Sequence, residues 1–235
     1  MGFMEAPFGT WFSQAKLLLE FIALLWGIAI VDLGFLNHAF LNAVIQKPRT
    51  LLGLFYYPFL SGLFHADWDH LTGNTLYFLL FGGIIILRDP THLWMVTIVT
   101  AILSGLGIWL IGNRRSCGAS GIIFGYLGFI VASAAIEKDL PSAAILAWLI
   151  FTFLFGNRLF YHGSDWDKNT TTSTANRVLW NAGQTFWGIV PGEDDRISWG
   201  THLLGLLSGV FAAQYKTILT PWVNQFVVWV QQIRV

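Results

Sequence analysis

The apolar positions of this chain fall into long unbroken stretches rather than into short alternating ones. One bilayer crossing by a helix needs about 20 largely apolar residues. Six stretches approach that length, at residues 16–35, 71–87, 93–111, 118–136, 143–161 and 199–215. We therefore expect an all-α membrane protein, a six-transmembrane-helix bundle in which residues 1–235 form a single integral membrane domain.

The segments between these stretches differ in character. Residues 37–68 are apolar and aromatic and are expected to lie in the membrane interface as short helices. Residues 162–197 are polar, which predicts a solvent-facing loop. The first stretch lacks a basic leader, so we expect it to remain as an anchor rather than to be cleaved.

The C-terminal segment, residues 217–235, has an amphipathic pattern. Trp222, Phe226, Trp229, Val230 and Ile233 share one helical face, and Asn224, Gln225, Gln231 and Gln232 lie opposite. This spacing predicts an interfacial helix that follows a core of residues 16–216.

Composition supports a lipid environment and excludes several classes of protein. The chain is 55% hydrophobic and 11% charged, with a mean hydropathy of +0.60, whereas a soluble domain has roughly 25% charged residues. Net charge is zero without a basic block, so nucleic acid is not an expected partner. Cys117 is the only cysteine, which excludes an internal disulfide and a cysteine-built zinc site. No metal or cofactor is expected.

Polar residues whose side chains could take part in catalysis occur at the starts of the second, fourth and sixth stretches. His70 and Asn74 are four residues apart and share a helical face, Ser120 opens the fourth stretch, and His202 opens the sixth. In a six-crossing chain these three starts lie on the same side of the membrane and at similar depth. Polar groups inside a bilayer are costly and usually functional. We therefore expect the four side chains to converge.

Each of these groups also has a structural interpretation. Gly118, Ser120 and Gly121 could be small residues that let helices approach closely. His202, with Gly205 and Gly209, could be an interfacial histidine on a packing face, and His70 with Asn74 could be a polar clasp. Together, these structural interpretations would require three independent coincidences of depth, so the shared depth favours catalysis. A serine nucleophile needs an adjacent base, and histidine can serve as that base near neutral pH. His70 and Asn74 can both donate hydrogen bonds toward one point.

Three motifs in this order resemble the rhomboid intramembrane serine proteases over residues 16–216. They are His-x4-His-x3-Asn (His65, His70, Asn74), Gly-x-Ser-Gly (Gly118, Ser120, Gly121) and His-x2-Gly-x3-Gly (His202, Gly205, Gly209). The resemblance implies that Ser120 is the nucleophile and His202 the base of a dyad without a carboxylate. It also implies that His70, Asn74 and the backbone N–H of Ser120 line an oxyanion hole, that His65 is a structural neighbour, and that Phe124 packs against His202.

The chain departs from the family pattern in two places. The first loop lacks the Trp-Arg pair that the family often carries, and Gly82-Gly83 is not followed by a glutamate. The resemblance implies a plasma or inner membrane location with the active site on the outer side. The positive-inside rule favours the reverse, because that topology places five Lys and Arg residues inside and eight outside.

The implied reaction is hydrolysis of peptide bonds in or near transmembrane segments of other membrane proteins. Substrate entry is expected past the fifth stretch, which carries Trp148, Phe151, Phe153 and Phe155, beneath a lid of residues 162–197. Two alternatives stay open, a non-proteolytic rhomboid-like protein that binds membrane clients and a small transporter. The pattern carries no signal for an oligomeric state.

Overall fold

The computed structural model describes residues 8–44, 49–112, 116–138, 143–144, 147 and 199–233. All elements within these ranges are helical, and no strand occurs among them. Almost all of the expected fifth stretch, with the aromatic gate at Trp148, Phe151, Phe153 and Phe155, and the whole lid at 162–197 lie outside the described residues. The count of six crossings therefore stays a prediction.

Four helical spans in the described part are long and apolar enough to cross a membrane. The first is α1 (Phe8–Ala29) continued by the π-helical η1 (Ile30–Phe35). The second joins α4 (Trp68–Tyr77), η4 (Phe78–Gly82) and α5 (Gly83–Arg88). The third is α6 (His92–Ile111) and the fourth α7 (Ser120–Glu137). These spans include the first four apolar stretches, apart from Gly118 and Ala119, which precede α7.

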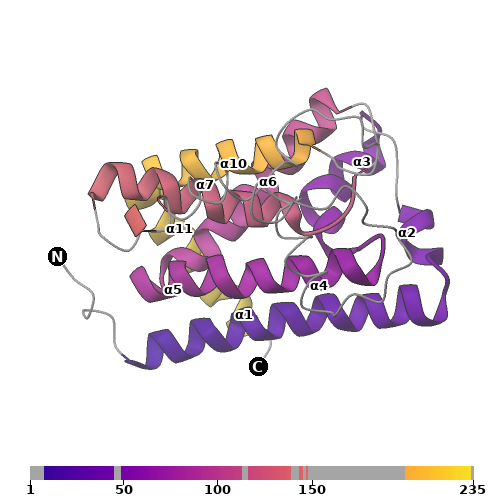
Figure 1. Ribbon diagram of the computed structural model, residues 1–235, viewed down its shortest axis with the longest axis horizontal. Coiled ribbons are helices and arrows are strands. Elements are labelled where there is room, and N and C mark those ends of the chain that lie inside the picture. Colours follow the sequence, from indigo (N-terminus) through magenta and orange to yellow (C-terminus); the bar gives the residue numbers. More distant parts are fainter. Residues whose placement is uncertain are drawn as a thin grey trace, which may run out of the picture.

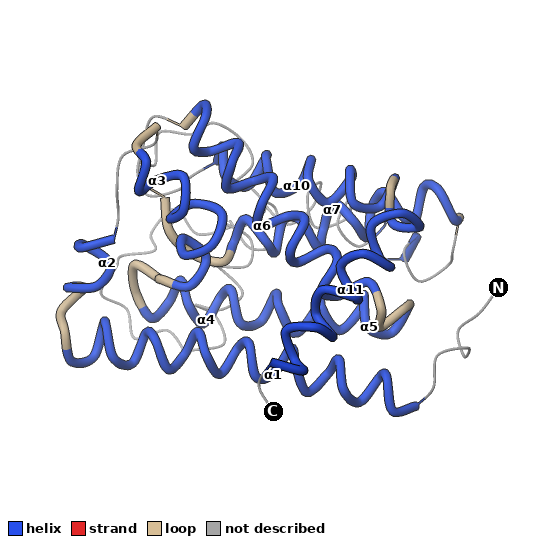
Figure 2. Tube along the Cα trace, turned by 180° about the vertical axis from the view of Figure 1, so that it is seen from behind, coloured by secondary structure: helices blue, strands red, loops and turns tan. Residues whose placement is uncertain are grey.

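The sixth stretch becomes a bent pair of helices. α10 (Trp199–Gln214) is followed by α11 (Lys216–Ile233), which turns away by 99°. Sixteen residues of α-helix rise about 24 Å, less than the roughly 30 Å hydrocarbon core. α11 packs against α6 and crosses the back of the bundle (Figure 2).

The expected first loop consists of short helices. These are α2 (Ala39–Val44), α3 (Leu51–Phe55), η2 (Tyr56–Leu60) and the 3-10 turn η3 (Ser61–Leu63). The buried carboxylate of Asp32 accepts hydrogen bonds from the backbone N–H groups of Phe40 and Leu41. The indole N–H of Trp109 donates to the Thr50 carbonyl and ties this segment to α6 (2.8 Å).

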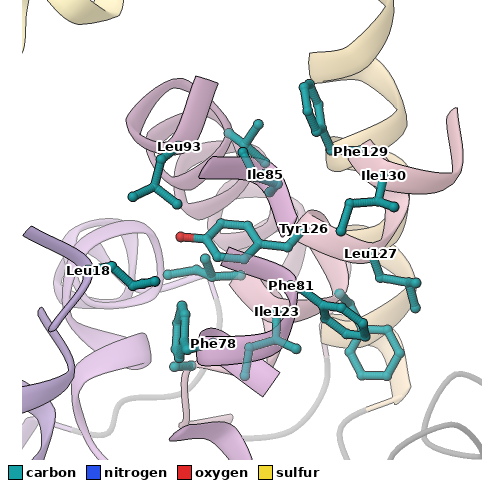
Figure 3. Packing of buried hydrophobic residues seen from close by; sticks show 14 of the residues in the cluster. Leu18, Phe78, Phe81, Ile85, Leu93, Ile123, Tyr126, Leu127, Phe129 and Ile130 are labelled. Carbon is teal, nitrogen blue, oxygen red and sulfur yellow. The ribbon is translucent and has the colours of Figure 1, made fainter. Parts of the chain in front are cut away.

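α7 is the most buried of the spans and lies in the middle of the bundle (Figures 1 and 2). Tyr126 is fully buried among side chains of α1, η4, α5 and α6, including Leu18, Phe78, Ile85 and Leu93 (Figure 3). Its hydroxyl is hydrogen-bonded to Thr97 of α6 at 2.7 Å. A phenol in an apolar core needs such a partner, so this pair fixes α7 against α6.

Glycines set the distance between α7 and α10. A Cβ added at Gly205 would overlap the carbonyl of Gly121, and one added at Gly209 would overlap the carbonyl of Gly125. The backbones of the two helices are thus in direct contact along two successive turns, as small residues permit in membrane bundles. The residue numbers increase in the same direction in these two pairs, from Gly121–Gly205 to Gly125–Gly209. Therefore α7 and α10 run in parallel and begin at the same end (Figure 1).

A charged cluster lies where α7 and α10 end. Arg88 Nη2 donates to Glu137 at 2.6 Å, and Lys216 forms an ion pair with the same carboxylate. Glu137 therefore links the ends of α5 and α7 to the start of α11, immediately after the bend.

Candidate active site

A serine and a histidine from two helices meet at the end where α7 and α10 begin. Ser120 Oγ and His202 Nε2 are 2.8 Å apart, within hydrogen-bonding distance. Both residues are 8% exposed. Ser120 is the first residue of α7, and His202 lies in the first turn of α10. The close contact between Gly121 and Gly205 lies next to this pair and holds the two backbones near enough for the side chains to meet.

An aromatic ring orients the imidazole. Phe124 stacks on His202 with ring centroids 4.3 Å apart and an angle of 24° between the planes. Because Phe124 is one helical turn after Ser120, α7 supplies both the hydroxyl and the ring surface that holds the imidazole. A histidine kept in one plane beside a serine hydroxyl is an arrangement that can activate the hydroxyl as a nucleophile.

Two carboxylates of the first span, Asp32 and Glu20, are engaged away from His202, and Asp32 is buried. Asp32 accepts its hydrogen bonds from the start of α2. Glu20 lies on α1, where it forms an exposed i,i+4 ion pair with Lys16. Neither residue therefore serves as the third member of a triad.

His70 lies beside the loop that precedes Ser120. Asp67 caps α4 by accepting from the His70 backbone N–H (2.7 Å), which positions His70 in the first turn. A Cβ added at Gly118 would overlap the His70 ring, so the imidazole rests directly on the backbone two residues before Ser120. Gly118 has a φ of +103°, a conformation that favours glycine and turns the chain into α7.

His65 orients the Asn74 amide. Asn74 Nδ2 and His65 Nε2 are 3.0 Å apart, and both side chains are buried. An amide nitrogen can only donate, so His65 Nε2 accepts and its ring is neutral. Burial, followed by the charge of nearby His70, lowers the pKa of His65 to about 3. Asn74 keeps a second N–H for another acceptor.

The Cys117 thiol is a poor competitor of Ser120 for the role of nucleophile. Burial, aided by the negative charge of Asp67, raises the pKa of this thiol to about 11. The reactive species of cysteine is the thiolate, which is scarce at neutral pH with such a pKa.

Further contacts hold the loop before Ser120, and of the residues that make them the sequence singled out only Gly118. The Gly118 N–H donates to the Ser61 carbonyl (2.8 Å), and the Tyr56 hydroxyl donates to the Ser116 carbonyl (3.4 Å). Ser116 Oγ also lies 2.9 Å from Thr201 Oγ1. For Thr201, its adjacency to His202 is the signal that could have drawn attention to it.

Comparison with known proteins agrees with the motifs. Residues 50–217 match the family model described as the Rhomboid domain. The chain is similar to an uncharacterized protein of Mycobacterium leprae, with 31% identity over 214 residues, 86% of this chain and 71% of the relative. An uncharacterized protein of Mycobacterium tuberculosis is 29% identical over 213 residues, 86% of this chain and 75% of the relative. The chloroplast rhomboid-like protein 11 of Arabidopsis thaliana is 32% identical over 80 residues, 32% of this chain and 29% of that protein.

Proposed function

Because the chain belongs to the rhomboid family, we propose that it is an intramembrane serine endopeptidase that cleaves peptide bonds in or near transmembrane segments of membrane proteins. The hydrogen bond between Ser120 Oγ and His202 Nε2 carries this proposal. Neither client binding nor transport requires a serine hydroxyl paired with an oriented imidazole.

Acyl transfer through a serine ester uses these groups as follows. Ser120 Oγ attacks the scissile carbonyl carbon while His202 Nε2 takes the hydroxyl proton. The imidazolium then gives that proton to the leaving amine as the C–N bond breaks. A water molecule, deprotonated by the same imidazole, hydrolyses the ester and returns Ser120 to its starting state.

The negative charge that develops on the carbonyl oxygen needs donors. In this proposal His70, Asn74 and the backbone N–H of Ser120 supply them. The Asn74 amide is held by His65 through one of its two N–H groups, which leaves the other for the oxyanion. Donors preorganised in this way are each worth roughly 3 kcal/mol of transition-state stabilisation.

The substrate must expose a carbonyl that is not already paired. In a transmembrane helix every backbone group is hydrogen-bonded internally, so the scissile segment has to unwind before it reaches Ser120. We expect segments with helix-weakening glycine, proline or β-branched residues near one membrane surface to be cleaved preferentially.

We further propose that the catalytic end faces the outer side and that the amphipathic C-terminal helix lies in the opposite interface. Three cationic residues lie at helix ends away from Ser120: Arg88 ends α5, Lys138 follows α7, and Lys216 begins α11. The aromatic side chains of Trp222, Phe226 and Trp229 are exposed on α11. Aromatic residues favour the headgroup region. Labelling of Lys138→Cys, in a Cys117→Ala background, with an impermeant maleimide tests this orientation. Labelling of intact cells would reverse the assignment.

The decisive test uses purified protein in liposomes with a single-span reporter and a fluorophosphonate probe. Wild type should cleave the reporter and become labelled, whereas Ser120→Ala should do neither and His202→Ala should lose most of both. Ser133→Ala is the matched control, since Ser133 is another buried serine on α7. Labelling that survives in Ser120→Ala, or a folded wild type that is neither labelled nor active, would exclude the proposed chemistry.

A further inference from the structure

Thr201, the residue immediately before His202, connects the two halves of the candidate site. Its Oγ1 lies 2.9 Å from the Oγ of Ser116, a hydrogen bond in which either hydroxyl can donate. Ser116 is four residues before Ser120 and is 7% exposed. This contact therefore joins the start of α10 to the loop that enters α7, across 85 positions of sequence.

Ser116 is itself held on its other side. Its carbonyl accepts from the hydroxyl of Tyr56, which is 1% exposed, and the neighbouring Gly118 donates to the carbonyl of Ser61. The loop before Ser120 is thus fastened to the helical first loop at two points. A side chain that bonds to Ser116 is anchored to the larger body of the protein.

The second branch of Thr201 contacts α7. A Cβ added at Gly121 would lie 2.9 Å from Thr201 Cγ2, so the threonine methyl group rests against the residue that follows Ser120. The hydroxyl and the methyl group of Thr201 consequently touch the chain on both sides of Ser120. Keeping both contacts restricts the χ1 angle of Thr201, which as a β-branched side chain is already stiff at χ1.

The position of His202 depends on how the first turn of α10 is rotated. First turns lack part of the intrahelical hydrogen bonding and are the least rigid part of a helix. Because Thr201 is in this turn and its side chain is fixed on two sides, it resists rotation of the backbone that carries the imidazole.

We propose that the Ser116–Thr201 hydrogen bond is a positioning element that holds His202 within bonding distance of Ser120. This inference rests on the proposed function. Neither residue touches the reacting atoms in this scheme; both act through the geometry of the pair. A misplacement of about 1 Å costs on the order of 10²-fold in rate.

The test compares variants by their rate of fluorophosphonate labelling and by kcat and KM on the reporter. Thr201→Val keeps the methyl group and removes the hydroxyl. It should lower the labelling rate and kcat by roughly 10- to 100-fold with little change in KM. Ser116→Ala should have a similar effect, and the double variant should be no worse than either one, because all three lack the same bond. Thr201→Ser keeps the hydroxyl and loses only the methyl group, so it should retain most of the wild-type labelling rate.

Thr97→Val is the control for stability. It removes a buried threonine hydroxyl of α6 that bonds the Tyr126 hydroxyl at 2.7 Å. This substitution should lower stability about as much as Thr201→Val does, but it should leave the labelling rate unchanged. Two results would overturn the positioning role alone. In the first, the wild type is labelled and Thr201→Val is labelled at the same rate. In the second, the losses of labelling rate in Ser116→Ala and Thr201→Val multiply in the double variant. A wild type that is not labelled would overturn the proposed function together with this inference.

Discussion

The contact between Gly121 and Gly205 makes a sharp prediction about both stability and catalysis. In Gly205→Ala the new methyl group would overlap the Gly121 carbonyl oxygen and lie 3.0 Å and 3.2 Å from the Gly121 carbonyl carbon and Cα. All three atoms belong to the backbone of α7, so no side-chain rotation can relieve the overlap. The two helices must move apart at the level of Ser120 and His202.

The size of the effect follows from these distances. Overpacking of this kind costs about 1–3 kcal/mol, and the better helix propensity of alanine offsets only about 0.5–1 kcal/mol. The Ser120–His202 hydrogen bond is 2.8 Å long, and a separation of roughly 0.5–1 Å takes it out of bonding range. We therefore expect a net loss of about 1–2 kcal/mol and a fall of roughly 10²-fold in labelling rate.

Gly27→Ala provides the matched comparison. Gly27 is an exposed helical glycine of α1 with nothing within 4 Å of an added Cβ. The substitution should leave labelling unchanged and leave stability equal or higher by a few tenths of a kcal/mol. Unfolding in detergent by SDS titration, followed by tryptophan fluorescence, measures stability for both variants. If Gly205→Ala matches Gly27→Ala in unfolding midpoint and labelling rate, the close contact does not control the site.

Three further predictions concern other parts of the bundle. The lowered pKa of His65 means that below about pH 6.5 the unfolded chain binds a proton that the folded protein does not, so stability falls toward pH 3 by at most about 1.4 kcal/mol per pH unit. His65→Gln should flatten this slope in melts across pH, and an unchanged slope would contradict the assignment. Thr75→Val removes the acceptor of the Trp26 indole (2.9 Å) and should cost about 1–2 kcal/mol without slowing labelling of the serine; a midpoint equal to wild type would show that the bond contributes nothing. Glu137→Gln leaves the two cations that flank it facing each other and should lower stability by about 1 kcal/mol, less at 1 M salt; a loss that grows with salt would argue against an electrostatic cause.

Much of the architecture could be predicted from the chain, because length and hydropathy respond directly to the thickness of the bilayer. The four described spans coincide with the first four apolar stretches within a few residues at most ends. The largest difference is at the N-terminus, where α1 begins at Phe8 rather than near Lys16. Residues 8–15 include Trp11 and Phe12, and they carry no helix breaker other than Gly9, so the helix continues although the run of strongly apolar residues has not begun.

The bend between α10 and α11 was only partly predictable. The amphipathic pattern placed the end of the core at residue 216, close to the turn at Tyr215, but it gave no angle between the two helices, which is 99°. Pro221 lies inside α11 and does not mark the turn. The ion pair between Lys216 and Glu137 fixes the start of α11, and nothing in the local pattern specifies which carboxylate a lysine will find.

By itself, the sequence determined the first four helical spans, the helix ends at which the polar residues lie, and the order of the motifs, since these depend on local periodicity and on the cost of polar groups in lipid. Tertiary structure decided that Ser120 and His202, which are 82 positions apart, meet at 2.8 Å. It also decided that the Thr201 hydroxyl bonds to Ser116 and that the backbones of Gly121 and Gly205 are in contact. Such distances depend on how two helix surfaces interlock at the scale of single atoms, and that information resides in pairs of distant residues rather than in any one segment.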